Sequence, residues 1–288
     1  MELTQNGLHG RSVTTALHSF SLTACGLVIT VLSECEDTLR NINKYLLPWL
    51  PRHGSRPASE DLLFAVTNSA STGCFQLVLN GSGVHDDAPE QQVFSTLQRI
   101  VDAAIIRRVN GRAFIHAAVV VYRGAGVLLS GSSRSGKTTL AAELIARGAQ
   151  YASDEFAVVD EQGIVYPWPR PLMVRRPNAG PHPVLASELG AQVRRTPVRA
   201  SWIFFLRHTN TAAVHVRSLS RAETVMRLLQ NTPNVLQENP GILRNFLSVC
   251  RDGNGFEGVR GEAPNAAEQL LRFITSGDSS DLQRTRSI

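Results

Sequence analysis

One short run of this sequence carries the residue types of a phosphate-binding loop. The run matches the pattern G-x-x-x-x-G-K-[ST] and consists of Gly131, Ser132, Ser133, Arg134, Ser135, Gly136, Lys137 and Thr138, with Thr139 directly after it. Glycines let the backbone turn so tightly that successive N–H groups point at phosphate oxygens. A helix that begins at the end of such a loop adds the positive end of its dipole. The pattern therefore predicts that Lys137 reaches the outer phosphates of a nucleotide and that the Thr138 hydroxyl binds Mg²⁺.

Lysine usage supports this interpretation. Of the 29 lysines and arginines in the 288-residue chain, only Lys44 and Lys137 are lysines. A compact ammonium group fits between phosphates, where a planar guanidinium does not. The single lysine of the loop therefore lies at the one position where an arginine would not serve.

A site that transfers a phosphoryl group also needs acidic side chains, either for the metal ion or for the attacking nucleophile. Asp154 and Glu155 are the first candidates after the loop, and they lie beside a strand-like run at residues 156–159. Asp160 and Glu161 precede a glycine and have the composition of an ordinary turn. We expect Asp154 to serve the metal ion or the nucleophile, whereas Glu155 is equally well explained as part of a turn.

His116 interrupts an apolar run, where a lone histidine is more often a packed core residue than a catalytic one. The other seven histidines show no ligand spacing, so the sequence assigns none of them to a metal ion. The four cysteines show no C-x-x-C spacing, which is typical of a reduced, cytoplasmic protein.

Strands and helices must hold these residues in place. Apolar runs predict strands at 113–121 and 127–130, followed by a helix at 138–147 that ends before Gly148. The other predicted strands cover residues 19–25, 27–32, 62–67, 75–79, 156–159, 164–166, 202–206 and 213–216. The other predicted helices cover residues 36–50, 89–109 (with Pro89 in the first turn), 221–230 and 266–275. Because strands and helices mix along the whole chain, the sequence predicts an α/β fold.

Composition and charge exclude several classes of protein. With 43% hydrophobic and 18% charged residues, the chain can bury a core and is neither disordered nor fibrous. No apolar run reaches the roughly 18 residues of a membrane span, and the first residues show no start of a secretory signal. Acidic residues outnumber basic ones by ten to six in residues 1–105, whereas basic residues outnumber acidic ones by 23 to 14 in residues 106–288. The basic part suits a phosphate ligand or an acidic partner.

Landmarks around the loop resemble the catalytic domain of HPr kinase/phosphorylase, and the looser set of HPr-kinase-related proteins is more similar still. In that family a strand histidine precedes the loop, the next helix ends in Arg-Gly, and an acidic pair follows. The corresponding residues here are His116, Arg147-Gly148 and Asp154-Glu155. The similarity covers residues 112–159. It implies a P-loop domain related to ATP-dependent phosphoenolpyruvate carboxykinase, and phosphoryl transfer to a serine hydroxyl.

The resemblance also implies roles for single residues. His116, Lys137 and the acidic pair correspond to active-site positions, and Thr138 corresponds to the Mg²⁺-binding hydroxyl. The family's acidic pair is usually Asp-Asp and often has the proton acceptor as its second member, so Glu155 departs from it. We therefore expect Asp154 to accept the proton, with Glu155 as its close rival. The family's late Glu-containing segment, near an Arg-Gly-Leu-Gly run, is not visible here. Its phosphate-sensing arginine has three candidates in this chain, which are Arg170, Arg207 and Arg221.

Together these features predict an ATP- and Mg²⁺-dependent serine kinase of the HPr-kinase-like type. We expect a smaller α+β domain for partner binding at 1–110, the catalytic P-loop domain at 111–275 and a flexible tail at 276–288. The expected partner is a protein or peptide with an acceptor serine, such as a ribosomal precursor peptide of the lasso type. We expect no nucleic-acid or membrane partner, and a homo-oligomer agrees with the resemblance.

Three alternatives stay open on the sequence alone. The first is a nucleotide-binding regulatory protein that transfers no phosphate, and the second is HPr kinase/phosphorylase itself. The third is a P-loop ATPase that acts on nucleic acid. The chain has no apolar run ending in Asp-Glu and only 6% aromatic residues, so the third alternative is the least supported.

Overall fold

The chain is a mixed α/β protein that divides into two units. The computed structural model describes residues 17–45, 61–69, 71–109, 111–132, 135–175, 181–210, 213–232, 241–276 and 283–284. The first unit comprises Met1–Lys44 and Pro51–Ala104, and the second comprises Tyr45–Leu50 and Ile105–Ile288. The division falls within α2 (Glu90–Arg108), near its carboxyl end.

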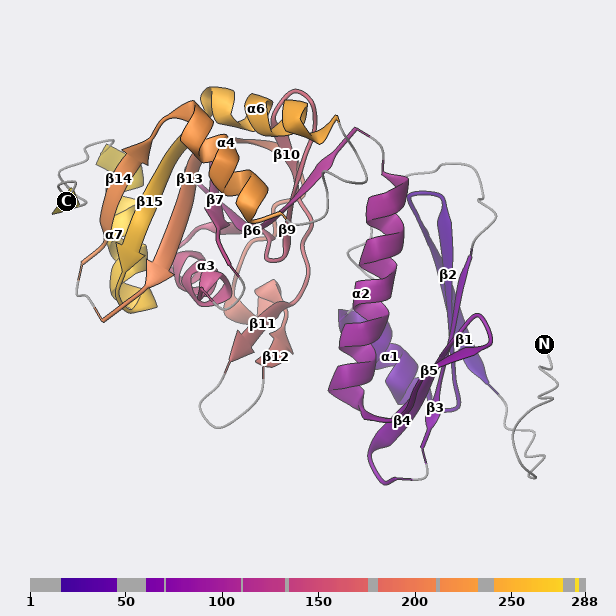
Figure 1. Cartoon of the computed structure of the whole chain (residues 1–288). Coiled ribbons are helices and arrows are strands. Elements are labelled where there is room, and N and C mark those ends of the chain that lie inside the picture. Colours follow the sequence, from indigo (N-terminus) through magenta and orange to yellow (C-terminus); the bar gives the residue numbers. More distant parts are fainter. Residues whose placement is uncertain are drawn as a thin grey trace. The chain divides into compact units, whose positions relative to one another are not determined.

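The first unit is built on a five-stranded sheet (Figure 1). In order across the sheet, its strands are β1 (His18–Ala24), β2 (Leu27–Ser33), β3 (Leu62–Asn68), β4 (Cys74–Leu79) and β5 (Ser82–Pro89). The helix α1 (Glu36–Tyr45) lies between β2 and β3 in the chain, and these two strands are parallel. The other neighbours are antiparallel.

Both helices of the first unit cover the same face of this sheet (Figure 1). Along β2, the buried residues Leu27, Ile29 and Val31 alternate with half-buried ones, as expected for a strand with one face in a core. Ile42 of α1 and Leu97 of α2 are fully buried as well. The first unit therefore has a hydrophobic core of its own.

The second unit contains a larger sheet (Figure 1). Among the described residues its strands are β6 (Ala113–Tyr122), β7 (Ala125–Ser130), β8 (Gln150–Ser153), β9 (Phe156–Val159), β10 (Ile164–Tyr166), β13 (Val198–His208), β14 (His215–Leu219), β15 (Asn254–Arg260) and β16 (Gln283–Arg284). Their order is β10-β9-β6-β7-β13-β15-β14-β16, and β8 pairs with β6. The strands β7, β13 and β15 are parallel, so their carboxyl ends meet at one edge of the sheet. A separate ribbon consists of β11 (Leu172–Arg175) and β12 (Pro181–Val184).

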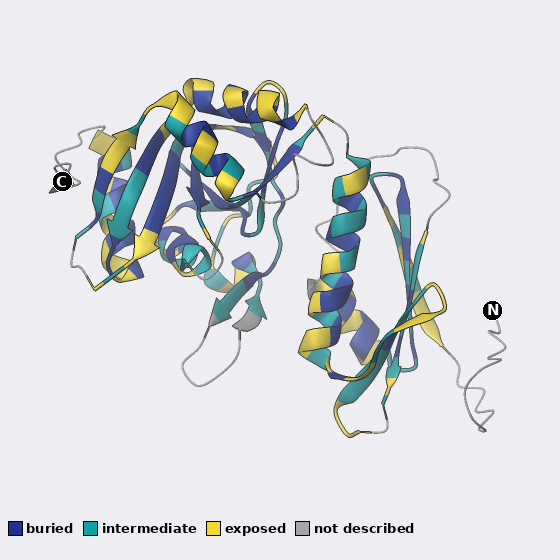
Figure 2. Ribbon diagram, viewed as in Figure 1, coloured by how far each residue is buried: buried dark blue, intermediate teal, exposed yellow. Residues whose placement is uncertain are grey.

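Helices cover both faces of the larger sheet. On one face α3 (Lys137–Ala146) and α7 (Ala263–Ser276) contact each other and share a core with Val127, Leu129 and Phe204. On the other face α4 (Arg221–Gln230) and α6 (Ile242–Asp252) pack over Leu128, Ile203 and their neighbours. Figure 2 shows the central strands in dark blue between these helices. A sheet buried on both faces explains why β6 and β7 read as continuous apolar runs.

Most predicted elements around the loop are confirmed, within one to four residues at their ends. The prediction that Pro89 belongs to the first turn of a helix is wrong, because Pro89 ends β5 and α2 begins at Glu90. The sequence did not predict the strands β5, β8, β11, β12 and β15 or the helix α6. The predicted helix at 36–50 is described only as far as Tyr45. Of the predicted tail, Ser276 ends α7 and Gln283–Arg284 pair with β14, while the other residues lie outside the described part.

Among the residues that the structure describes, no helix combines the length and the apolar character needed to cross a membrane.

Candidate functional site

The glycine-rich loop connects β7 to α3. β7 is buried from Gly126 to Ser130, so the start of the loop is anchored in the core. Gly136 directly precedes α3 with a φ of 82°, in the left-handed region that favours glycine. A Cβ atom at this position would also collide with the guanidinium of Arg260. The glycine is therefore required for its backbone conformation, and a side chain here would also have to displace the Arg260 guanidinium.

The predicted nucleotide-binding residues form this loop and the first turn of α3 where the structure describes them. Ser133 and Arg134 lie outside the described residues. Ser135 places its hydroxyl in a buried position without a hydrogen-bond partner in the described part of the chain. Thr139 follows on α3 and is exposed.

Lys137 bends back over the loop that precedes it. Its Nζ donates hydrogen bonds to the carbonyl oxygens of Gly131, at 2.8 Å, and Ser132, at 2.9 Å. Burial lowers the pKa of Lys137, and the nearby carboxylates of Glu155 and Asp154 oppose this effect. The ammonium group is therefore held against the first two residues of the loop.

Asp154 and Thr138 lie in direct contact. Asp154 lies between β8 and β9, and its Oδ2 accepts a hydrogen bond of 3.0 Å from the Thr138 hydroxyl. The Asp154 side chain is buried, and its Oδ1 has no hydrogen-bond partner among the described residues. Burial raises the pKa of Asp154 to about 6, and the neighbouring Glu155 contributes to the increase. The positive charge of Lys137 opposes this increase in part, and Oδ1 remains available for a further ligand.

His116 and Glu155 form a second contact next to the first. His116 lies on β6, and its Nδ1 is 3.5 Å from Oε1 of Glu155. Burial and the positive charge of Lys137 lower the pKa of His116, whereas Glu155 raises it. The imidazole is therefore predominantly neutral at pH 7. About half of the Glu155 side chain is exposed, unlike that of Asp154.

The structure thus brings His116, Lys137, Thr138, Asp154 and Glu155 to one end of the sheet, where the sequence expects them together. Thr138 and Asp154 form one linked pair, and His116 and Glu155 form the other. The charges of Glu155, Asp154 and Lys137 influence one another across these pairs.

Arg260 is a site residue that sequence reasoning missed. It ends β15 and is almost completely buried. Its guanidinium donates hydrogen bonds to the carbonyl oxygens of Ser135, at 3.4 Å, Gly136, at 3.0 Å, and Gly261, at 2.8 Å. This side chain therefore holds the second half of the loop against the carboxyl end of β15, which is separated from β7 by β13.

The three arginines that the sequence left open lie in different environments. The hydroxyl of buried Tyr151 donates a hydrogen bond to the carbonyl oxygen of Arg170 and accepts one from its backbone N–H. The Arg170 guanidinium lies 5.9 Å from the centre of the Phe156 ring. Arg221 begins α4, is exposed, and donates from Nε to the carbonyl of Cys250 on α6. Arg207 lies at the end of β13 and lines a cavity that the loop also lines.

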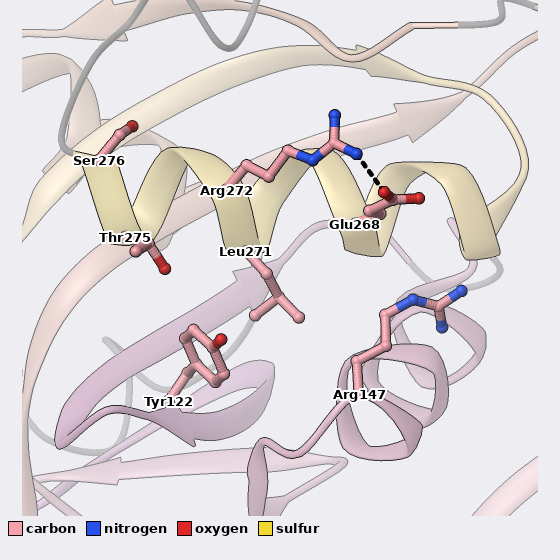
Figure 3. Close-up of a pocket in the computed structure, with 7 residues that line it drawn as sticks. All are labelled: Tyr122, Arg147, Glu268, Leu271, Arg272, Thr275 and Ser276. Atoms are coloured by element: carbon pink, nitrogen blue, oxygen red, sulfur yellow. Dashed lines mark hydrogen bonds and ion pairs between the residues drawn. The ribbon is translucent and has the colours of Figure 1, made fainter.

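A second cavity of about 570 Å³ lies elsewhere on the same unit, between α7, the end of α3 and the end of β6 (Figure 3). Arg272 forms an ion pair with Glu268 in its wall, and Arg147 is paired with Glu143 of its own helix. None of the predicted site residues lines this cavity. It is therefore a separate feature from the candidate site.

The residues present fit a nucleotide with Mg²⁺. The Thr138 hydroxyl and the Asp154 carboxylate are oxygen ligands of the kind that Mg²⁺ prefers. The Oδ1 atom of Asp154, which has no hydrogen-bond partner among the described residues, is available to bind the ion. Magnesium usually takes only one or two protein ligands and completes its shell with phosphates and water. The loop and Lys137 supply donors for the phosphates.

Comparison with known proteins finds matches among solved structures but none by sequence. No protein-family model matches the chain, and no curated protein matches its sequence. Among solved structures, that of the Hpr(Ser) kinase/phosphatase from Coxiella burnetii is similar to this chain. The two are 16% identical, and the match covers 57% of this chain and 95% of the other with a TM-score of 0.34.

Proposed function

We propose that this protein is a kinase that transfers the γ-phosphoryl group of ATP, with Mg²⁺, to a serine hydroxyl of a protein or peptide. The observation that carries the proposal is the hydrogen bond between Thr138 and Asp154. It joins the hydroxyl at the start of a phosphate-loop helix to a buried carboxylate, beside the ammonium group of Lys137. This combination is what the binding of a metal–nucleotide complex requires.

Each group of the site has a task in this proposal. The N–H groups of the loop and the ammonium of Lys137 hold the phosphates, while Thr138 and Asp154 hold the metal ion. When bound, MgATP supplies the phosphoryl group and the cationic charge that neutralises its oxygens. Arg260 keeps the loop in the shape that aims its N–H groups.

The proton of the acceptor hydroxyl needs a carboxylate that the acceptor can reach. Sequence reasoning ranks Asp154 first for this role, with Glu155 as the rival. The geometry favours Glu155, because Asp154 is buried and bonded to Thr138 whereas Glu155 is half exposed. The neutral imidazole of His116 lies 3.5 Å from Glu155 and can orient it. We therefore propose Glu155 as the base and Asp154 as the metal ligand.

The acceptor is proposed from the resemblance together with the charge distribution. The resemblance implies a serine, and a ribosomal precursor peptide of the lasso type is one such acceptor. The excess of basic residues after residue 105 suits an acidic substrate.

Transfer of label from γ-labelled ATP to serine-containing proteins and peptides tests the proposal. We expect Mg²⁺-dependent labelling of serine, and we expect Lys137→Ala to abolish both ATP binding and labelling. Glu155→Gln should lower the rate of labelling by roughly a hundredfold or more, while ATP binding persists. Asp154→Asn should lower both the rate of labelling and the Mg²⁺-dependent part of the affinity for ATP.

A broad acceptor panel, including HPr, separates the alternatives. Tight MgATP binding with no label on any serine acceptor would contradict the kinase proposal and support a nucleotide-binding regulatory protein. Labelling of HPr in preference to other acceptors would instead support HPr kinase/phosphorylase itself.

A further inference from the structure

A cavity of about 590 Å³ adjoins the glycine-rich loop on the α4 side of the larger sheet. Gly131, Ser132 and Ser135 of the loop form part of its wall. The rest comes from the carboxyl ends of β13 and β15, from β14, and from the end of α4. The crevice at the carboxyl ends of parallel strands is where ligands bind in open α/β sheets. The cavity therefore extends directly from the proposed phosphate site.

The cavity and the acid–base residues lie on opposite sides of the loop strand. In the sheet, β7 has β6 on one side and β13 on the other. His116 lies on β6, and Asp154 and Glu155 follow β8, which pairs with β6. The cavity is lined by β13 and the strands beyond it. A phosphate chain held by the loop thus has its reacting end on the β6 side and its other end on the cavity side.

The cavity wall holds basic and amide groups in fixed positions. Glu257 is mostly buried and forms ion pairs with Arg217 and, at 2.6 Å, with Arg227. Arg227 also donates to the side-chain amide oxygen of Gln230 at 3.0 Å. Arg217 is also paired with Glu223, at 2.8 Å. These contacts fix two guanidinium groups and balance both of their charges, which favours a ligand of mixed polar and aromatic character over a simple anion.

Arg207 is a charged side chain of this wall that is free to contact a ligand. It is exposed, and it forms no hydrogen bond or ion pair with any described residue. A planar guanidinium stacks on aromatic rings and donates to ring acceptors and hydroxyls. Arg207 can therefore contact a base or a sugar without breaking an existing interaction.

The geometry points to this cavity as the site for the nucleoside half of the nucleotide, with Arg207 and Gln230 among its contacts. The inference rests on the proposed function, because it takes the loop as the phosphate site. It makes the cavity the part of the protein that distinguishes ATP from inorganic polyphosphates.

Binding of ATP and of inorganic tripolyphosphate, each with Mg²⁺, tests the inference by calorimetry on the full chain. Arg207→Ala and Gln230→Ala should each weaken ATP binding by about tenfold and tripolyphosphate binding by less than about twofold. Gln230→Ala changes no charge, so its effect is free of long-range electrostatics. Arg195→Ala is the matched control, because Arg195 is exposed and lies outside the cavity wall. All three variants should keep the unfolding temperature of the parent chain.

The outcomes separate failure of the inference from failure of the proposed function. Equal weakening of ATP and tripolyphosphate, or no weakening of either, would overturn the nucleoside assignment while leaving the loop as a phosphate site. Unchanged ATP binding with a raised KM for an acidic acceptor would also overturn it, since the cavity would then hold the acceptor. No binding of either polyphosphate to the parent chain would contradict the proposed function itself.

Discussion

Asp154 is the residue at which stability and function oppose each other. Its carboxyl group is buried, and burial raises its pKa from the ordinary 3.8 to about 6. Above pH 6 the protein must therefore keep a buried negative charge that has only one hydrogen bond from a side chain. A buried charge of this kind costs stability until a cation or a donor neutralises it.

Replacing Asp154 with asparagine should stabilise the ligand-free protein in a pH-dependent way. Because the folded-state pKa is higher than that of the unfolded chain, the wild type is stabilised by protonation at low pH. It loses this stability as the pH rises from about 4 to about 6. The asparagine variant lacks the effect, so above pH 6 it should be more stable by up to about 3 kcal/mol, and near pH 4 it should equal the wild type. Urea unfolding across this pH range measures both values. Glu161→Gln, at an exposed turn, is the control, and a pH-independent difference would contradict the explanation.

Lys137 tests whether charge alone suffices in the loop. Lys137→Arg keeps the charge but replaces the compact ammonium with a planar group, so it should weaken polyphosphate binding by roughly tenfold or more. Lys44→Arg is a natural control, because Lys44 is the other lysine of the chain and lies on α1 in the first unit. Calorimetric titration with tripolyphosphate compares the two variants. Equal affinity in both would show that the position requires only a positive charge.

Arg260 connects two elements that are far apart in the sequence. It brings the end of β15 to the carbonyls of the loop before α3. Arg260→Met removes the group that donates hydrogen bonds to three carbonyl oxygens. It should therefore lower the free energy of unfolding by about 1–3 kcal/mol and weaken ATP binding. Arg260→Lys should keep more of the stability and of the ATP affinity than Arg260→Met, because lysine retains a hydrogen-bond donor and a positive charge. Thermal unfolding and ATP titration measure the effects. Arg251→Met, at an exposed end of α6, should change neither property, and loss of stability without loss of ATP binding would limit Arg260 to a structural role.

The elements next to the loop were predictable from the sequence because they are regular. β6 and β7 are buried on both faces and read as apolar runs, and Gly148 ends the helix after the loop with its left-handed φ of 95°. The loop motif and the acidic pair Asp154-Glu155 follow in the same stretch. Local pattern therefore predicted most of the candidate site.

β15 and α6 were not predictable, for reasons that lie in the tertiary structure. Gly255 and Gly258 interrupt the strand pattern of β15, and a Cβ at these positions would collide with Thr224 and with the carbonyl of His215. α6 begins after Gly241 without a capping side chain, so it lacks a start signal in the sequence. Arg260 was missed with β15, since no local pattern indicates that a strand end contacts a loop more than 100 residues earlier.

At the scale of the whole molecule, the two units have separate hydrophobic cores. Saturation with MgATP should slow hydrogen exchange of the β7 and α3 amides, by about 100-fold at a ligand concentration 100 times the Kd if these amides exchange by opening of the second unit. The amides of β2 and β3 in the first unit should keep their rates, because the ligand site lies in the second unit. Exchange measured by mass spectrometry on peptides from both units provides the comparison. Equal slowing in both units would show that they open together.

The hydrogen bonds of Lys137 have a consequence for which anions the protein admits. Its ammonium group already donates to the carbonyl oxygens of Gly131 and Ser132, so these carbonyls compete with a bound anion for the N–H groups of Lys137. One N–H of the ammonium group remains for an incoming anion, and a second contact to Lys137 must replace one of the two existing bonds. Two adjacent phosphates can do so with bonds between oppositely charged groups, whereas a lone phosphate or a carboxylate has fewer contacts to offer. Selection against abundant small anions is thus built into the backbone of the loop, without a residue dedicated to excluding them.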